Sequence, residues 1–197
     1  MEKLIDELYK EIILDESLFF RGIPLGSMIS SVEKIEGTNF FKRTGNNPSY
    51  EYLKDIGEVE RLELYYNFNL DTEKIYKVNL TFDTYPDFYF QEETGKGLSD
   101  FVQLMEQCNI EEYSTIHNTL FDKIFQLFTK LLSDHEEEES IDEIFNKKHN
   151  SFKRFIWHIN NEKLHDKPLR LALTSYLDDK DLQNIKQKIN IQLEETI

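Results

Sequence analysis

Hydrophobic and polar residues alternate in four segments, which form two pairs: Arg61 to Leu70 with Ile75 to Asp83, and Leu169 to Leu177 with Ile185 to Glu194. In an extended strand, every second side chain lies on the same face. Each pair therefore predicts an antiparallel hairpin with one face toward the core and one toward water. In the first pair, the row expected to face the core consists of Leu62, Leu64, Tyr66, Phe68, Leu70, Tyr76, Val78, Leu80 and Phe82.

Apolar residues at helical spacing precede each pair of strands. Residues 2–15 repeat apolar side chains at intervals of three and four, which predicts an amphipathic helix. Ser27 is expected to cap a second helix, which has Ile29 and Ile35 on its inner side and ends at Gly37. The first half of the chain is therefore expected to contain helices followed by a pair of strands.

The second half opens with the broadest apolar face of the sequence. It covers residues 116–132 and predicts the longest helix, lying across the sheet. Residues 98–108 predict a further helix, and residues 141–145 predict one or two helical turns. Residues 38–49, with their Gly, Asn and Pro, predict an exposed loop, and the acidic segment 134–139 is expected to be solvated.

Residues 152–159 fit both a helix and a strand. A strand with Phe155, Trp157 and Ile159 inward is favoured, because Asn160 and Asn161 follow as a turn. The helical alternative stays open at this point.

Together these elements predict an α+β protein, with an antiparallel sheet and helices packed on one face. One arrangement is two tandem α-α-β-β(-β) units, of which residues 1–96 form the first and residues 97–197 the second. The two units are expected to pack together as one globular body.

The composition indicates an ordered chain and restricts its partners. Of 197 residues, 39% are hydrophobic and 13% aromatic, which is too apolar for disorder. The formal net charge of −15 disfavours nucleic acid and anionic membranes as partners, and favours a basic protein. The single cysteine, Cys108, and a start without an export signal predict a cytoplasmic protein.

The sequence lacks the spacings that common catalytic and metal sites require. Gly95-Lys96 has no phosphate-loop context, and His135-Glu136 has no second histidine at zinc-site spacing. His117, His149 and His158 are isolated from one another in sequence. We therefore expect no cofactor, no metal and no enzymatic activity.

The segment Gly22-Ile23-Pro24-Leu25-Gly26-Ser27-Met28-Ile29-Ser30-Ser31-Val32-Glu33-Lys34-Ile35-Glu36-Gly37, followed by paired strands, resembles one unit of two kinds of domain. These are beta-lactamase-inhibitor-like domains and small lipoprotein domains of outer-membrane assembly. The tandem layout also resembles immunity proteins of bacterial toxin systems. The second resemblance implies a cytosolic protein that binds a toxin domain and blocks it.

Function is accordingly expected to lie in protein binding. In this hypothesis acidic side chains meet a basic patch on the toxin, and tyrosines anchor the contact. One alternative is an enzyme whose site joins distant residues, such as His158 with Glu162 or Asp166; another is a structural or adaptor protein, and the oligomeric state stays open. The candidate partner-binding residues are Tyr65, Asn67, Asp83, Tyr85, Asp87, Tyr89, Glu92, Glu93, Glu136, Glu137, Glu138 and Glu139.

Overall fold

The computed structural model describes residues 1–56, 60–83, 110–133, 137–145, 148–160, 165–178 and 186–196. Its helical elements are α1 (Glu2–Ile12), the short 3-10 turn η1 (Ile29–Ser31), α2 (Glu33–Glu36) and α5 (Ile110–Leu132). Its strands are β1 (Phe41–Arg43), β2 (Ser49–Asp55), β3 (Arg61–Phe68), β4 (Ile75–Asp83), β5 (Glu137–Phe145), β6 (Lys148–Ile159), β7 (Leu169–Asp178) and β8 (Lys186–Glu195).

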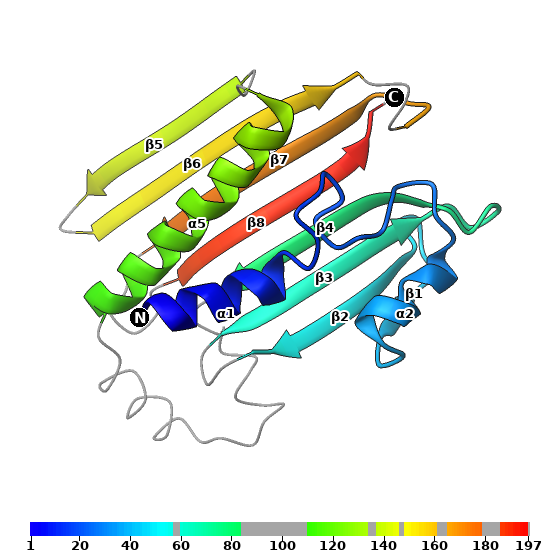
Figure 1. Ribbon diagram of the computed structural model, residues 1–197, viewed down its shortest axis with the longest axis horizontal. Helices are drawn as coiled ribbons and strands as arrows, with labels where there is room; N and C mark the ends of the chain where they lie inside the picture. The colour runs from blue at the N-terminus through cyan, green and yellow to red at the C-terminus, as the bar shows by residue number, and fades with distance from the viewer. Residues whose placement is uncertain are drawn as a thin grey trace.

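All eight strands form one antiparallel sheet in the order β1-β2-β3-β4-β8-β7-β6-β5 (Figure 1). The first four strands and the last four each follow one another along the chain, and β4 pairs with β8 at the junction. The predicted α+β class with an antiparallel sheet is confirmed. The predicted unit boundary at residue 96 lies outside the described residues.

The described helices lie on one face of this sheet, as predicted (Figure 1). α5 runs across β6, β7 and β8, and α1 lies beside it. The two helices are joined by Lys123, whose Nζ lies 2.6 Å from Asp6 Oδ1 and 4.4 Å from the centre of the Tyr9 ring. Aromatic rings fill the space below α5, where Phe128 and Trp157 meet edge to face at 5.9 Å.

The strands predicted from alternation are confirmed. β3 alternates half-buried and buried residues along its whole length, and Val78, Leu80 and Phe82 of β4 are buried beside it. Residues 152–159 belong to β6, so the strand interpretation holds over the helical one. Trp157 and Ile159 face the helices and are buried, and Phe155 is partly buried.

The sequence analysis did not predict β1, β2 or β5, and it assigned two of their segments to other structures. Residues 38–49 were expected to be a loop, but they contain β1 and the first residue of β2. Residues 141–145 were expected to be helical, but they continue β5, which begins inside the acidic segment at Glu137. Both errors fall at or near the edges of the sheet, where a strand pairs on one side only and needs little apolar surface.

Four local predictions near the second helix and hairpin were wrong. Leu70, expected in the core row, lies beyond the end of β3 and is exposed. Ser27 does not cap a helix, because the helical turn begins only at Ile29 and its N-cap residue makes no side-chain hydrogen bond. Ile35 is exposed. Tyr76 does not face the core, because an irregularity in β4 pairs Phe68 with Ile75 and Asn67 with Lys77 and leaves Tyr76 between them. Ile75 is buried in its place.

A buried ionic cluster joins the segment after α1 to α2, β2 and β3. Glu36 accepts hydrogen bonds from Arg21 Nε at 2.8 Å, from Arg21 Nη2 at 2.6 Å and from the Tyr66 hydroxyl at 2.5 Å, and it also pairs with Lys54. Burial alone would raise the pKa of Glu36, but the hydrogen bonds and charge of Arg21 hold it below its usual value. The carboxylate therefore stays ionised inside the protein.

Gly37 ends α2 in a backbone conformation with φ 94° and ψ −174°, which is almost exclusive to glycine. Alanine at position 37 is expected to lower the free energy of unfolding by about 1–3 kcal/mol, because its side chain strains the backbone in this conformation. Gly45 is the matched control, since an added Cβ meets no atom within 4 Å at either position and Gly45 lacks the positive φ. Urea unfolding of Gly37→Ala and Gly45→Ala measures the difference. Equal losses in the two variants would contradict this assignment.

Candidate functional site

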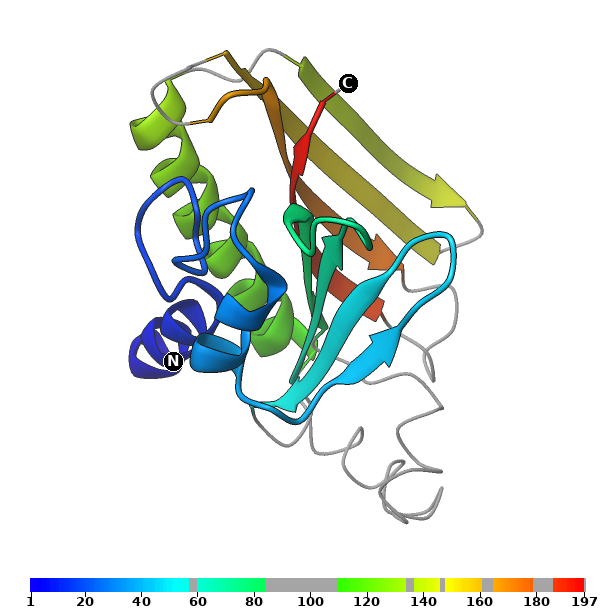
Figure 2. The same ribbon diagram turned by 90° about the vertical axis from the view of Figure 1, so that its right-hand side faces the viewer.

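The face of the sheet opposite the helices is covered by no helix of the described residues (Figure 2). Its side chains form ladders across the strands. Thr81 of β4 lies opposite Asn190 of β8, whose Nδ2 donates to Asn79 Oδ1 at 2.8 Å and to Thr81 Oγ1 at 3.1 Å. We call the surface formed by the outward residues of β1 to β8 the open face; it is mostly polar, and it also includes Leu53, Ile156 and Ala172.

Ion pairs cross the open face between neighbouring strands. Burial would raise the pKa of Glu194, but Lys77 and Arg170, both at 3.0 Å, lower it. Other ion pairs of the open face join a carboxylate on one strand to a cation on its neighbour in the same way. These further pairs are Arg43–Glu51 at 2.7 Å, Asp55–Arg61 at 3.1 Å, Asp83–Lys188 at 2.7 Å and Glu139–Arg154 at 3.7 Å.

Three predicted partner-binding residues, Tyr65, Asn67 and Asp83, lie on the open face. Tyr65 is half-buried on β3, and burial, with Glu63 and Glu51 nearby, raises its pKa. Asn67 is half-buried two positions further along the same strand. Asp83 is only 3% exposed and pairs with Lys188, so it belongs to the internal ladders of the face. The part these residues play in binding remains a prediction.

Glu137, Glu138 and Glu139 open the edge strand β5, and the last two are exposed. β5 and β3 are separated by β4, β8, β7 and β6. Five strand spacings amount to about 24 Å. The structure therefore places the predicted tyrosine and the predicted glutamates on opposite flanks of the sheet, and Glu138, which lies opposite Phe155, is on the helix-facing side. Tyr85, Asp87, Tyr89, Glu92, Glu93 and Glu136 lie outside the described residues.

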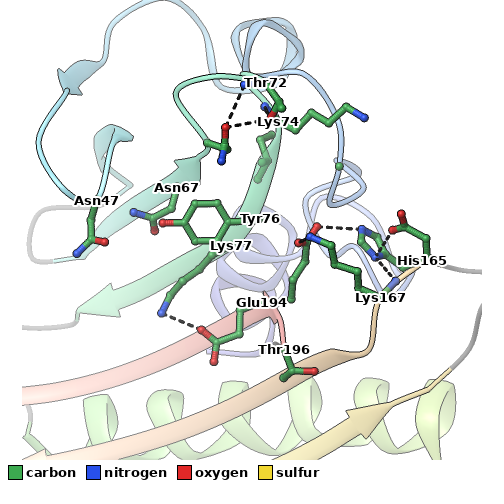
Figure 3. A pocket seen from close by; sticks show the side chains of 15 residues that line it. Asn47, Asn67, Thr72, Lys74, Tyr76, Lys77, His165, Lys167, Glu194 and Thr196 are labelled. Atoms are coloured by element: carbon green, nitrogen blue, oxygen red, sulfur yellow. Dashed lines mark hydrogen bonds and ion pairs between the residues drawn. The ribbon is translucent and has the colours of Figure 1, made fainter.

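A cleft of about 890 Å³ opens at one end of the sheet, where β4 and β8 meet (Figure 3). Its walls come from five separate segments: Gly26, Asn47, the hairpin between β3 and β4, residues 165–167, and residues 194–196. The sequence analysis missed this cleft, because no local pattern joins segments so far apart.

Most charged groups of the cleft are paired with one another, whereas Lys74 has no ion-pair partner among the described residues. His165 lies in the wall with Nε2 3.3 Å from Glu195 Oε1, and its Nδ1 accepts a hydrogen bond from the backbone N–H of Lys167 at 3.2 Å. Glu195 also pairs with the ammonium of Lys167, and this contact raises the pKa of Lys167. On the opposite wall, Lys77 is held by Glu194.

Tyr76 occupies the middle of the cleft (Figure 3). It is half-buried, and its hydroxyl points toward the side where Asn47 and Asn67 lie. The irregularity of β4 causes this placement, because a bulge residue leaves the ladder and its side chain is re-aimed. A regular strand would have turned Tyr76 toward the helices.

A second histidine site lies within the core. His117 of α5 is 2% exposed, and its Nε2 lies 3.0 Å from Ser175 Oγ of β7. Burial lowers the pKa of His117 to about 4, so the ring is neutral near pH 7. Its Nδ1 has no hydrogen-bond partner in the part of the chain that the structure describes. A nucleophile and base need contact with substrate, so this pair is better explained as core packing.

Only part of the alternative site predicted around His158 lies within the described residues. His158 lies on β6 opposite Arg170, on the open face, whereas Asp166 is exposed beside His165 in the cleft. Glu162 lies outside the described residues. Within the described ranges, no group of three or more His, Cys, Asp or Glu side chains has an arrangement that could hold a metal ion.

No helix among the described residues is long and apolar enough to cross a membrane. Comparisons of the chain with protein-family models, with curated proteins and with solved structures give no match.

Proposed function

We propose that this protein is a binding protein of the immunity type, which binds a basic toxin domain on the open face and blocks it. The observation that carries the proposal is the open face itself, a mostly polar surface across eight strands with no described helix over it. Sheet faces of this kind are rigid, so a partner can dock without a large ordering cost.

The ion pairs of the open face support docking of a protein. Covering an isolated charge is costly, because the charge loses water and gains no partner. On the open face, carboxylates such as Glu194 and Asp83 already have cations within 3.0 Å. A partner could therefore cover them without leaving a lone charge buried.

The net charge supports a basic partner. The chain carries 38 acidic and 23 basic residues, a formal net charge of −15. The edge strand β5 contains five acidic residues and no basic residue. The acidic residues are Glu137, Glu138, Glu139, Asp142 and Glu143. The negative electrostatic field of such a surface raises the association rate of a basic protein and repels acidic proteins.

The dimensions of the open face fit an interface of ordinary size. A patch of about 800 Å² per partner is about 30 Å across. The distance of about 24 Å between β3 and β5 lies within this span. One toxin domain could therefore contact Tyr65 on one flank and Glu139 of β5 on the other.

The test is complex formation with the protein encoded by the adjacent upstream open reading frame, because immunity proteins are usually encoded beside their toxins. We expect a complex whose association rate falls about tenfold or more between about 0.05 and 0.5 M salt. Stopped-flow fluorescence measures the rate. No complex at micromolar concentration in low salt would overturn the proposal.

A charge-reversal pair locates the steering surface. Glu137→Lys/Glu139→Lys on β5, at alternate positions that share the face of the sheet on which Glu139 lies opposite Arg154, is expected to slow association about tenfold. Glu2→Lys/Glu7→Lys on α1 changes the net charge by the same amount but lies on the helical side of the sheet, away from the open face. This control is expected to slow association only about twofold. Equal slowing in both variants would show that net charge, and not the β5 edge, governs the encounter.

A further inference from the structure

The cleft is continuous with the open face. Asn67, Lys77 and Glu194 line the cleft, and the same residues form the last ladder of the open face. Its volume of about 890 Å³ lies at the upper end of the range for ligand sites, which suits a segment of chain better than one side chain. A partner on the open face would have this cleft beneath one of its edges.

The paired charges of the cleft disfavour an ionic ligand. Glu194 is satisfied by Lys77 and Arg170, and Glu195 by Lys167 and His165. A phosphate or a metal ion near Tyr76 would have to break these pairs to bind, because Lys74, which has no ion pair among the described residues, is exposed and extends away from Tyr76 (Figure 3). The cleft therefore offers its best contacts to a ligand that is polar and uncharged.

The groups left without partners suit a peptide backbone. Neither Asn47 nor Asn67 makes a side-chain hydrogen bond to any described residue, and the same is true of the Tyr76 hydroxyl. An asparagine amide both donates and accepts, as a peptide group does. The half-buried ring of Tyr76 adds an apolar surface between the two walls, and tyrosine is frequent among residues that dominate binding energy.

The wall of the cleft is held in place by the backbone. Gly26 has φ +84°, its N–H donates to the carbonyl of Ile75 at 2.7 Å, and the N–H of Ile75 donates to the carbonyl of Ser27 at 2.9 Å. These hydrogen bonds fix the turn at residues 24–27 to the start of β4, beside Tyr76. The cleft is thus formed before any ligand arrives, which lowers the cost of binding.

From this geometry we infer that the cleft receives an extended, uncharged segment of the same partner, with its backbone on Asn47 and Asn67 and one side chain against Tyr76. The inference rests on the proposed function. It assigns a binding role to three residues, of which only Asn67 was a candidate from sequence.

The test compares cleft variants in binding the protein encoded by the adjacent upstream open reading frame. Tyr76→Ala is expected to weaken affinity about thirty-fold, as for a tyrosine that a partner segment covers in a cleft. Asn47→Trp fills the cleft from an exposed loop, where folding is tolerant, and is expected to weaken affinity at least as much. Tyr76→Phe keeps the aromatic ring, so its affinity is expected to fall much less than that of Tyr76→Ala. Isothermal titration gives the affinities, and thermal unfolding confirms that each variant is folded.

The outcomes separate this inference from the function on which it rests. If the wild-type chain binds and both Tyr76→Ala and Asn47→Trp bind equally well, the cleft inference is wrong and the proposed function stands. If the wild-type chain does not bind, both are wrong. If only the two cleft variants lose affinity while Glu2→Lys/Glu7→Lys retains it, both are supported.

Discussion

Replacement of Glu36 by glutamine is expected to lower the free energy of unfolding by about 3–5 kcal/mol. Glutamine has nearly the same shape, so the change removes charge and little else. The guanidinium of Arg21, 3% exposed, would then lie in the core with no carboxylate at 2.6 Å to neutralise it. Removing one member of a buried ion pair costs more than the pair contributes, because the remaining charge stays out of water.

The loss is expected to spread to α1. Arg21 Nη1 donates to the carbonyls of Glu11 and Ile12, which end that helix and have no later N–H within it. When Glu36 no longer fixes the guanidinium, these carbonyls lose their donor. Hydrogen exchange of α1 amides, measured together with the urea transition, is expected to accelerate in the last turn first.

Glu33→Gln is the matched control for this prediction. Glu33 begins the same short helix and is half-buried, but no ion pair to it is found among the described residues. Its replacement is expected to change stability by no more than about 0.5 kcal/mol. Similar losses for Glu36→Gln and Glu33→Gln would refute the role assigned to the buried cluster.

The long strands could be predicted from sequence because one of their faces is buried and the other faces solvent. In β3, Leu62, Leu64 and Tyr66 are fully buried, with half-buried residues between them, and this contrast is visible in the sequence as alternation. The same contrast identified β4, β7 and β8. α5 could be predicted because its broad apolar stripe covers several strands at once.

Strands near the edges could not be predicted in this way. β1 is exposed at all three positions, and β5 opens with three consecutive glutamates, so neither has an apolar row to detect. Their backbones are held by one neighbour, β2 or β6, through main-chain hydrogen bonds that depend little on side-chain type. β2 has a short row, Tyr50 and Tyr52, next to a stretch of turn-forming residues.

The sites depend on contacts between distant residues, which a single sequence does not reveal. Arg21 and Glu36 are 15 positions apart, and Tyr66 is a further 30 positions along the chain. Tyr76 was assigned to the core because strict alternation was extended through a position where the strand is irregular. The sequence signal that could have warned of this is Ile75, an apolar residue directly before the tyrosine.

The second large effect is expected on the pH dependence of stability, through His117. Burial lowers the pKa of His117 to about 4, from 6.5 in the unfolded chain. Between these pH values the unfolded state binds a proton that the folded state excludes, so stability is complete above about pH 6.5 and falls as the pH drops toward 4. A pKa difference of about 2.5 corresponds to about 3 kcal/mol, since each pKa unit is worth about 1.4 kcal/mol.

His117→Gln is expected to remove this part of the acid sensitivity. A glutamine amide can reach Ser175 as the imidazole Nε2 does, but it does not titrate. Urea unfolding at pH 7 and at pH 4.5 should show that the variant loses about 2–3 kcal/mol less than the wild-type chain between the two conditions. Ser175→Ala is the control, because it removes the 3.0 Å contact and leaves a titrating ring in the core, so its stability should shift by a similar amount at both pH values. Parallel pH profiles for the wild-type chain and His117→Gln would mean that the buried ring does not govern acid unfolding.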